Sequence, residues 1–145
     1  MNTALVSGAT GFVGRTLCRR LLEDGVSVVA AVRKPAEFPD AHIQPALVGN
    51  IDGATDWSHA LQGVDTVFHL AARVHVLRET AAQPLAEFRK TNVAGTEKLA
   101  RSAAAAGVKR LVYVSSIGVN GLYTEAGRKF SETDAAHPRS CHSLL

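Results

Sequence analysis

The chain has 145 residues, of which 46% are hydrophobic and 20% charged, and its formal net charge is +3 at pH 7. This composition is typical of a single soluble globular domain, and no apolar run approaches the roughly 18 residues that a membrane span needs. The positive charge is scattered over isolated pairs without a nucleic-acid motif, so we expect neither a nucleic-acid nor a membrane partner. The first residues lack a basic secretory start, which favours the cytoplasm.

A glycine-rich turn follows the first apolar run of the chain. Gly8, Gly11 and Gly14 have the spacing G-x-x-G-x-x-G, and a helical pattern begins directly after them. A strand that feeds such a turn aims its free N–H groups, and the positive end of the next helix, at a pyrophosphate. Side chains at Gly8 or Gly11 would block that approach. The stretch therefore predicts a dinucleotide-binding turn, supported by a second strand that ends about eighteen residues later.

Strand-like and helix-like stretches alternate along the rest of the chain. The predicted elements are a strand ending at Ser7, a helix over 14–24, strands over 26–32 and 43–48, a short helix over 56–61, a strand over 64–70, a long helix over 84–106 and a strand over 110–115. Pro84 suits the first turn of the long helix, whose expected inward residues are Leu85, Phe88, Leu99 and Ala103. Alternating strands and helices predict an α/β fold with a doubly wound parallel sheet of the Rossmann type, in the order 3-2-1-4-5.

The end of the second strand carries the side chain that would select the cofactor. Dinucleotide enzymes place an acid here for a free ribose 2′-hydroxyl, or a cation for a 2′-phosphate. Arg33 and Lys34 follow Val32, with no carboxylate to repel a phosphate. NADP is therefore favoured over NAD, with Arg33 as its contact. The alternative is that Arg33 stacks over the adenine or faces solvent.

Cysteine and histidine spacing does not indicate a metal site. Cys18 and Cys141 lack ligand spacing, and the six histidines form no i, i+4 pair and no cluster with cysteine beyond the adjacent Cys141 and His142. His69, at the end of a strand, is expected to be a packed core histidine rather than a base. Ser116 lacks the G-x-S-x-G elbow of a hydrolase nucleophile.

Five short motifs occur in a fixed order along the chain. They are Gly8-Ala-Thr-Gly11-Phe-Val-Gly14, Gly49-Asn-Ile-Asp52, His69-Leu-Ala-Ala72, Asn92-Val-Ala-Gly-Thr96 and Val114-Ser-Ser116. In order and spacing they resemble the NAD(P)-dependent epimerase/dehydratase family, the extended short-chain dehydrogenase/reductases, which act largely on nucleotide-activated sugars. The resemblance covers the chain to about residue 121. Ser115 to Gly121 is most similar to the nucleoside-diphosphate-sugar 4-epimerases and 4-keto-sugar reductases of bacterial surface-polysaccharide synthesis.

The resemblance implies a set of cofactor contacts. Phe12 and Val13 would offer backbone N–H groups to the pyrophosphate. Asn50 and Ile51 would edge and cover the adenine; Asn50 stands where the family usually has Asp, and its amide oxygen can still accept from the adenine amino group. Asn92 would face the active site from the long helix, or be solvated. The complete expected set is Gly8, Gly11, Phe12, Val13, Gly14, Arg33, Asn50, Ile51, Leu70, Ala71, Ala72 and Asn92.

Ser116 is the catalytic residue that the resemblance implies. A Ser or Thr at this position in the family hydrogen-bonds the substrate oxygen, beside a Tyr that transfers the proton and a Lys that lowers the Tyr pKa. No Tyr-x-x-x-Lys pair follows here, because Tyr113 belongs to the fifth strand and Tyr123 is followed four residues later by Gly127. The alternative for Ser116 is to cap a turn after the strand.

Two functions stay open at this point. In the first, residues 1–121 are the NAD(P)-binding domain of a nucleotide-sugar epimerase, dehydratase or reductase, and residues 122–145 are an irregular tail, the truncated start of the catalytic and substrate-binding region. The partner of the complete enzyme would be a nucleoside-diphosphate sugar, and this chain would be inactive alone. In the second, the chain is a non-catalytic dinucleotide-binding module with a sensing or regulatory role. We prefer the first, because Ser116 would have no task in a pure binder.

A truncated chain also has consequences for its surface. Without later strands, the sheet would be incomplete at its C-terminal end, with one edge and an apolar face uncovered. We therefore expect a homodimer, or aggregation through that surface.

Overall fold

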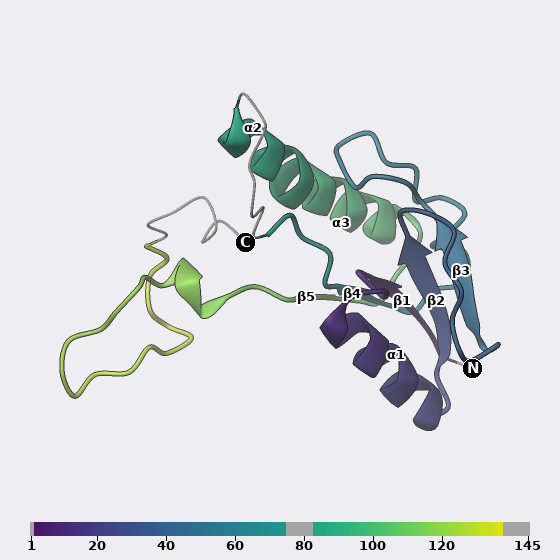
Figure 1. The fold of residues 1–145 in the computed structure, drawn as a ribbon, viewed down its shortest axis with the longest axis horizontal. Helices are drawn as coiled ribbons and strands as arrows, with labels where there is room; N and C mark the ends of the chain where they lie inside the picture. The colour runs from purple at the N-terminus through teal and green to yellow at the C-terminus, as the bar shows by residue number, and fades with distance from the viewer. Residues whose placement is uncertain (1, 75–82, 138–145) are drawn as a thin grey trace.

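A computed structural model describes residues 2–74 and 83–137 of the chain (Figure 1). Its strands are β1 (Thr3–Ser7), β2 (Ser27–Val32), β3 (Ile43–Leu47), β4 (Thr66–His69) and β5 (Arg110–Tyr113). They form one parallel sheet in the order β3-β2-β1-β4-β5. This confirms the α/β class and the strand order predicted from the sequence.

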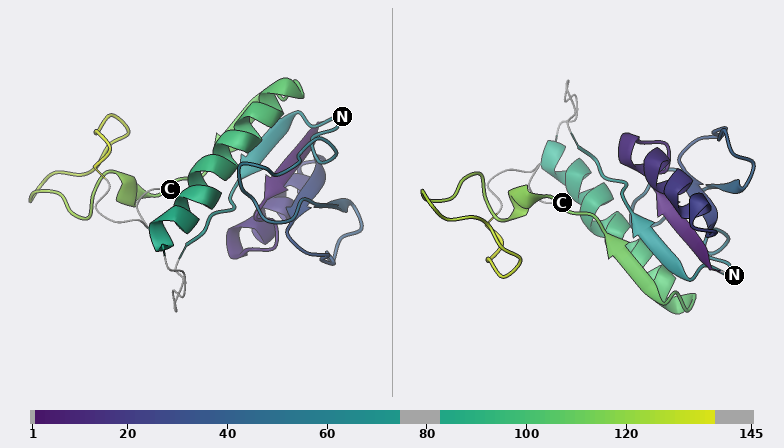
Figure 2. Two further views of the ribbon diagram at one scale, coloured as in Figure 1. Left: turned by 90° about the horizontal axis from the view of Figure 1, so that it is seen from above. Right: turned by 90° about the horizontal axis from the view of Figure 1, so that it is seen from below.

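Helices cover both faces of this sheet (Figures 1 and 2). Helix α1 (Phe12–Glu23) lies on one face, and α2 (Pro84–Phe88), η1 (Arg89–Gly95) and α3 (Thr96–Ala105) follow one another on the other. The last three together make the predicted long helix, but its central seven residues have π-helical rather than α-helical hydrogen bonds. The helix ends before Gly107, which has a φ of +77° that suits glycine.

The alternation of side chains along the central strands builds two apolar layers. On the α3 side, the buried cluster includes Leu5, Trp57, Val67, Leu99 and Ala103. On the α1 side, it includes Val6, Cys18, Val28, Ala30 and Val32. A strand covered on both faces needs apolar residues at successive positions, which explains the nearly continuous apolar run in β2.

Two predicted details are wrong. Residues 58–61 form turns instead of the predicted short helix. One helical bond joins the N–H of Leu61 to the carbonyl oxygen of Trp57 at 3.0 Å, but the N–H of Val64 bonds only three residues back, to Leu61 at 3.2 Å, so the helix does not continue. Leu85 is 41% exposed rather than inward, because it lies in the first turn of α2, which extends past the strands (Figure 1). Phe88 and Leu99, also expected inward, are buried.

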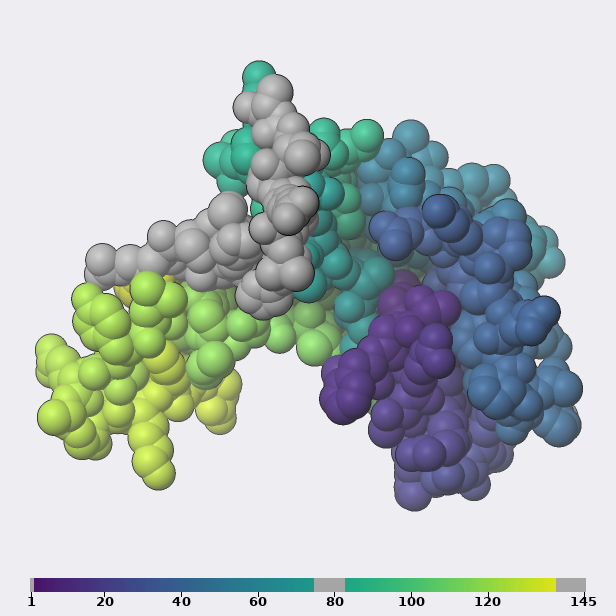
Figure 3. Space-filling view, viewed as in Figure 1, coloured from purple at the N-terminus to yellow at the C-terminus, as the bar shows by residue number. Residues whose placement is uncertain are grey.

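The chain after β5 leaves the body of the molecule. Residues 114–137 extend from the sheet and form a separate lobe (Figure 3), with one short 3-10 turn, η2 (Ile117–Val119). Within the described residues, none of the helices has the length and apolar character needed to span a membrane.

Candidate functional site

A pocket of about 590 Å³ lies where the parallel strands end at their carboxyl termini. Its walls come from the loops after β1, β2, β3 and β4 and from the start of the long helix. Among the expected cofactor residues, those that line it are Gly8, Gly11, Arg33, Asn50, Ile51, Leu70, Ala71 and Ala72. Open α/β sheets bind ligands at this edge, so the topology brings most of the predicted set to the expected place.

The glycine turn is packed too closely to carry side chains. A Cβ at Gly8, which has a φ of +74°, would lie 2.9 Å from the backbone nitrogen of Ala71. A Cβ at Gly14 would lie 2.1 Å from the carbonyl oxygen of Gly8, so Gly14 allows α1 to pack behind the turn. Phe12 and Val13 form the first turn of α1, where backbone N–H groups have no acceptor within the helix.

Asn92 holds the loop after β4 against the long helix. Its Oδ1 accepts the N–H of Arg73 at 2.7 Å, and its Nδ2 donates to the carbonyl oxygen of Arg73 at 3.0 Å. The side chain is only 6% exposed and is one of the expected residues outside the pocket wall. Asn92 therefore contacts the backbone that forms the wall, rather than the open space of the pocket.

His69 is buried between three elements of the fold. Its Nδ1 lies 2.6 Å from Ser7 Oγ on β1, and its Nε2 lies 2.9 Å from Thr96 Oγ1 on α3. The Tyr113 ring of β5 stacks on it, with ring centroids 5.7 Å apart. Burial lowers the pKa of His69 to about 4, so the ring is neutral near pH 7. The expected packed core histidine is what the structure contains.

Ser116 caps the turn that follows β5. Its Oγ accepts the N–H of Gly118 at 3.2 Å, which is the capping contact that the sequence left as the alternative. It lies outside the pocket wall, as do Phe12, Val13 and Gly14. The structure therefore does not bring Ser116 together with the cofactor residues that line the pocket.

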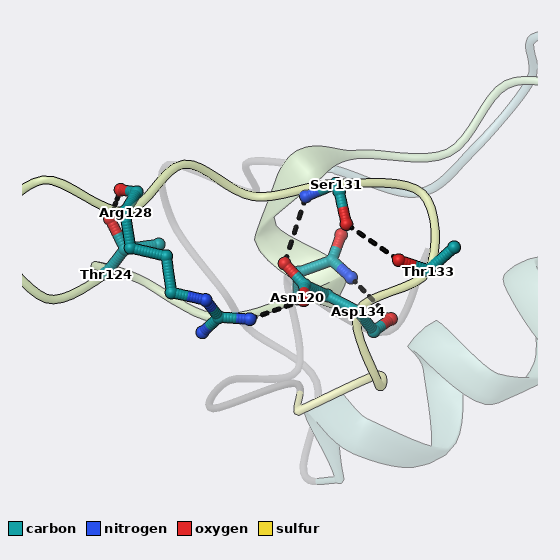
Figure 4. Close-up of polar contacts among 6 residues, drawn as sticks. All are labelled: Asn120, Thr124, Arg128, Ser131, Thr133 and Asp134. Carbon is teal, nitrogen blue, oxygen red and sulfur yellow. Dashed lines mark hydrogen bonds and ion pairs between the residues drawn. The ribbon is translucent and has the colours of Figure 1, made fainter.

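The lobe after β5 is held by one carboxylate (Figure 4). Asp134 pairs with Arg128 and accepts the N–H of Ser131 at 2.9 Å, while its own carbonyl oxygen accepts from Asn120 Nδ2 at 3.1 Å. A further bond joins the N–H of His137 to the carbonyl oxygen of Val119 at 2.8 Å. The segment expected to be irregular is thus closed on itself by hydrogen bonds, without further strands in its described part.

Metal-ligating side chains do not gather in the described part of the chain, where no three of His, Cys, Asp or Glu lie together. Cys18 is buried within the α1 layer, and burial raises the pKa of its thiol. Cys141 and His142 lie outside the described residues.

The comparison with known proteins decides the family. Residues 4–144 match the sequence profile of the NAD dependent epimerase/dehydratase family. The chain belongs to this family. The resemblance inferred from the five motifs is therefore confirmed for nearly the whole chain.

This epimerase-family chain is similar to several longer proteins. The UDP-glucose 4-epimerase of Vibrio cholerae is 39% identical over 141 residues, which are 97% of this chain and 42% of the relative. A 3-beta-hydroxysteroid dehydrogenase of Mycolicibacterium neoaurum is 36% identical over 123 residues, with 82% and 33% covered. The solved structure of MoeE5 in complex with UDP-glucose and NAD has a TM-score of 0.81 and 32% identity, with 99% and 45% covered. The chain spans less than half the length of each of these proteins.

The pocket of this epimerase-family chain has charged residues that sequence reasoning missed. Asp52 and Lys90 line it and form an ion pair at 3.8 Å, and Glu87 and Arg73 line it as well. The Arg73 guanidinium lies over the Phe88 ring, 5.5 Å from its centroid. These residues come from separate loops and from the helix, so no local pattern marked them; the only signal was that Asp52 closes the Gly49–Asp52 motif.

Proposed function

We propose that this chain is the NAD(P)-binding portion of a nucleotide-sugar epimerase, dehydratase or reductase. The observation that carries the proposal is that Gly8 and Gly11, which have no side chains, line the pocket directly before α1 begins at Phe12. Glycines at this place let a ligand approach the backbone N–H groups and the positive end of the helix, as a pyrophosphate must. When bound, the cofactor supplies hydride transfer at a sugar carbon.

The chain's own residues have separate tasks in this proposal. The N–H groups of Phe12 and Val13, at the positive end of α1, bind the pyrophosphate. Asn50 and Ile51 hold the adenine from the loop after β3, and the small side chains of Ala71 and Ala72 let the dinucleotide lie close to the loop after β4. MoeE5, which is 32% identical, was solved with UDP-glucose and NAD, and this supports both the cofactor class and the sugar-nucleotide class.

The cofactor proposal is tested by thermal unfolding of the purified chain. NAD(H) or NADP(H) at a hundredfold excess over its dissociation constant stabilises the folded state by about 2.7 kcal/mol and raises the melting temperature by several degrees. Ala72→Leu fills an exposed part of the pocket wall and should remove the shift. Ala104→Leu, an exposed change on α3 away from the pocket, should keep it. No shift of the unmodified chain with either dinucleotide at millimolar concentration refutes the proposal.

We further propose NADP as the preferred form, with Arg33 on the 2′-phosphate. Arg33 follows β2 and lines the pocket beside Asn50, whereas its neighbour Lys34 lies outside the wall. Arg33→Ala should weaken NADPH binding about tenfold or more while leaving NADH nearly unchanged, because a charge-assisted phosphate contact is lost. Lys34→Ala is the matched control and should change neither affinity. An equal loss for both cofactors in Arg33→Ala contradicts this assignment.

Catalysis by the chain alone is not part of the proposal. The sequence contains no Tyr-x-x-x-Lys pair, and Ser116 is the one remaining member of the expected catalytic set. We therefore expect dinucleotide binding without turnover of UDP-glucose, measured by product formation over hours at high protein concentration. Turnover by the unmodified chain would contradict this expectation.

A further inference from the structure

The floor of the pocket is a contact between two stretches of backbone. A Cβ at Gly8 would lie 2.9 Å from the nitrogen of Ala71 and 3.0 Å from the carbonyl carbon of Leu70, so the glycine turn and the loop after β4 already touch. Both stretches line the pocket. Whatever fixes the Leu70–Ala71 peptide against Gly8 therefore also fixes the shape of the floor.

Ser7 is the side chain that holds this peptide. It is fully buried, and its Oγ accepts the N–H of Ala71 at 3.3 Å and that of Leu70 at 3.2 Å, which Leu70 shares with the carbonyl oxygen of Ser7, also at 3.2 Å. A hydroxyl oxygen has two lone pairs and one hydrogen. Because both lone pairs face backbone donors, the hydrogen is directed to the remaining neighbour, Nδ1 of His69, at 2.6 Å.

This arrangement fixes the protonation of the imidazole. If Nδ1 accepts from Ser7, the neutral ring carries its hydrogen on Nε2, which lies 2.9 Å from Thr96 Oγ1. The two hydrogen bonds of the imidazole then run in one direction, from Ser7 on β1 through His69 on β4 to Thr96 on α3, which packs along the β4 side of the sheet (Figure 2). A ring with its hydrogen on Nδ1 would point a donor at the Ser7 hydroxyl, which would have to release one of the two backbone N–H groups.

We propose that His69 is a positioning residue for dinucleotide binding: as the Nε2–H tautomer it fixes the Ser7 hydroxyl, which holds Leu70 and Ala71 against Gly8. The effect on affinity rests on the proposed function, whereas the tautomer and the restraint on the two amides do not. A residue that only fills space would tolerate the loss of a hydrogen bond when its shape is kept. His69 acts through specific donors and acceptors, so isosteric changes around it should matter.

The tautomer is measured on the unliganded wild-type protein by nitrogen–hydrogen correlation NMR of the imidazole ring at neutral pH. We expect Nε2 to be protonated and Nδ1 to be an unprotonated acceptor. A ring protonated at Nδ1, or a mixture of the two tautomers, would overturn the proposal. This measurement requires no dinucleotide.

Two variants test the positioning effect. Thr96→Val keeps the side-chain shape but removes the acceptor for Nε2–H, and Thr96→Ser is the matched control that keeps the hydroxyl. Ser7→Ala removes the acceptor of Ala71 directly, whereas Leu70 keeps the carbonyl oxygen of Ser7. We expect Ser7→Ala to speed hydrogen exchange at Ala71 about tenfold relative to the rest of the sheet, and at Leu70 less. Thr96→Val should do so to a smaller extent, and Thr96→Ser should match the wild type.

Affinity for NADH and NADPH is measured on the same proteins. Ser7→Ala should bind whichever cofactor the wild type prefers about tenfold more weakly, with the Thr96→Ser control unchanged. Wild-type exchange and affinity in Ser7→Ala would overturn the positioning role. If the wild type binds neither dinucleotide, the proposed function fails, while the tautomer and the exchange rates still decide whether His69 restrains the pocket floor.

Discussion

His69 makes the stability of this fold depend on pH. An unperturbed histidine has a pKa of 6.5, and burial lowers the pKa of His69 to about 4. Between these values the unfolded chain binds a proton that the folded chain excludes. Above about pH 6.5, His69 is neutral in both states and the fold has its full stability. As the pH falls from 6.5 toward 4, protonation of His69 in the unfolded chain lowers the free energy of unfolding by up to about 3 kcal/mol.

Urea unfolding at about pH 7 and about pH 5 measures this loss. Hydrogen bonds lower the pKa values of Asp40, Asp56 and Asp65 below the ordinary value of an aspartate, so these carboxylates lose their contribution to stability only at more acidic pH. The slope above pH 5 should thus flatten in His69→Gln and persist in His42→Gln, a change at an exposed histidine. A slope that is identical in the wild type and His69→Gln would contradict the assignment.

Gly14 is a position where one methyl group should disrupt the fold. A Cβ there would lie 2.1 Å from Gly8 O and 2.8 Å from the Cα of Ala9, and both are backbone atoms that cannot rotate away. Gly14→Ala should therefore lower the free energy of unfolding by about 3 kcal/mol or more, despite the better helix propensity of alanine. Gly53→Ala is the control, because its Cβ would meet only Ala94 at 3.4 Å. Denaturant midpoints of the two variants give the comparison, and equal midpoints would refute it.

Sequence spacing predicts some of these residues and not others. Gly8 and Gly14 were predictable because a phosphate-binding turn needs glycines at fixed local intervals. The partnership of Ser7 with His69 was not, since 62 residues separate them and only the parallel pairing of β1 with β4 brings them together. Ser116 was predicted from a family position, yet its structural neighbour is the local N–H of Gly118, which spacing alone could not distinguish from a site contact.

At the scale of elements, the π-helical segment η1 connects the long helix to two walls of the pocket. Asn92 binds both backbone groups of Arg73, and a Cβ at Gly95 would lie 2.7 Å from Cγ2 of Ile51. Asn92 and Gly95 are the buried residues of η1. The helix thus touches the loop after β4 through Asn92 and the loop after β3 through Gly95.

Asn92→Leu tests the first of these connections. It leaves the N–H and C=O groups of Arg73 without the amide that now binds them, so we expect the free energy of unfolding to fall by about 1–3 kcal/mol. Glu97→Gln changes an exposed ion pair with Arg101 on the same helix and should cost less than about 1 kcal/mol. Unfolding monitored by circular dichroism compares the two. A loss in Asn92→Leu no larger than in Glu97→Gln would show that the Arg73 contact is not stabilising.

The existence of this helix was predictable, but its π segment was not. Pro84 and Gly107 mark its ends through local backbone preferences, and Leu99 and Ala103 mark its buried face by helical spacing. The shift to π-helical bonding has no such local signal in the sequence. Its buried residues, Asn92 and Gly95, contact Arg73 and Ile51, which lie 19 and 44 residues earlier in the sequence, and only the folded chain brings those loops to the helix.

At the scale of the whole molecule, one side of the sheet ends at an exposed apolar edge. Strand β5 is the last strand of the sheet, and the lobe that follows it stands apart from α1 (Figure 3). The chain that follows β5 has four exposed apolar side chains among its described residues, Val114, Ile117, Leu122 and Tyr123. Unpaired strand edges and exposed apolar residues favour association with another chain.

We therefore expect self-association through this edge at concentrations on the order of 100 µM, measured by sedimentation velocity. Leu122 and Tyr123 are 68% and 79% exposed, so replacing both by Ser should weaken association without removing core packing. Leu47→Ser is the matched control, because Leu47 is 59% exposed on β3, the strand at the opposite edge. A monomer at all concentrations would refute the expectation. If Leu47→Ser weakened association equally, Leu122 and Tyr123 would contribute no more than another exposed apolar residue. The association would then not be specific to the lobe after β5.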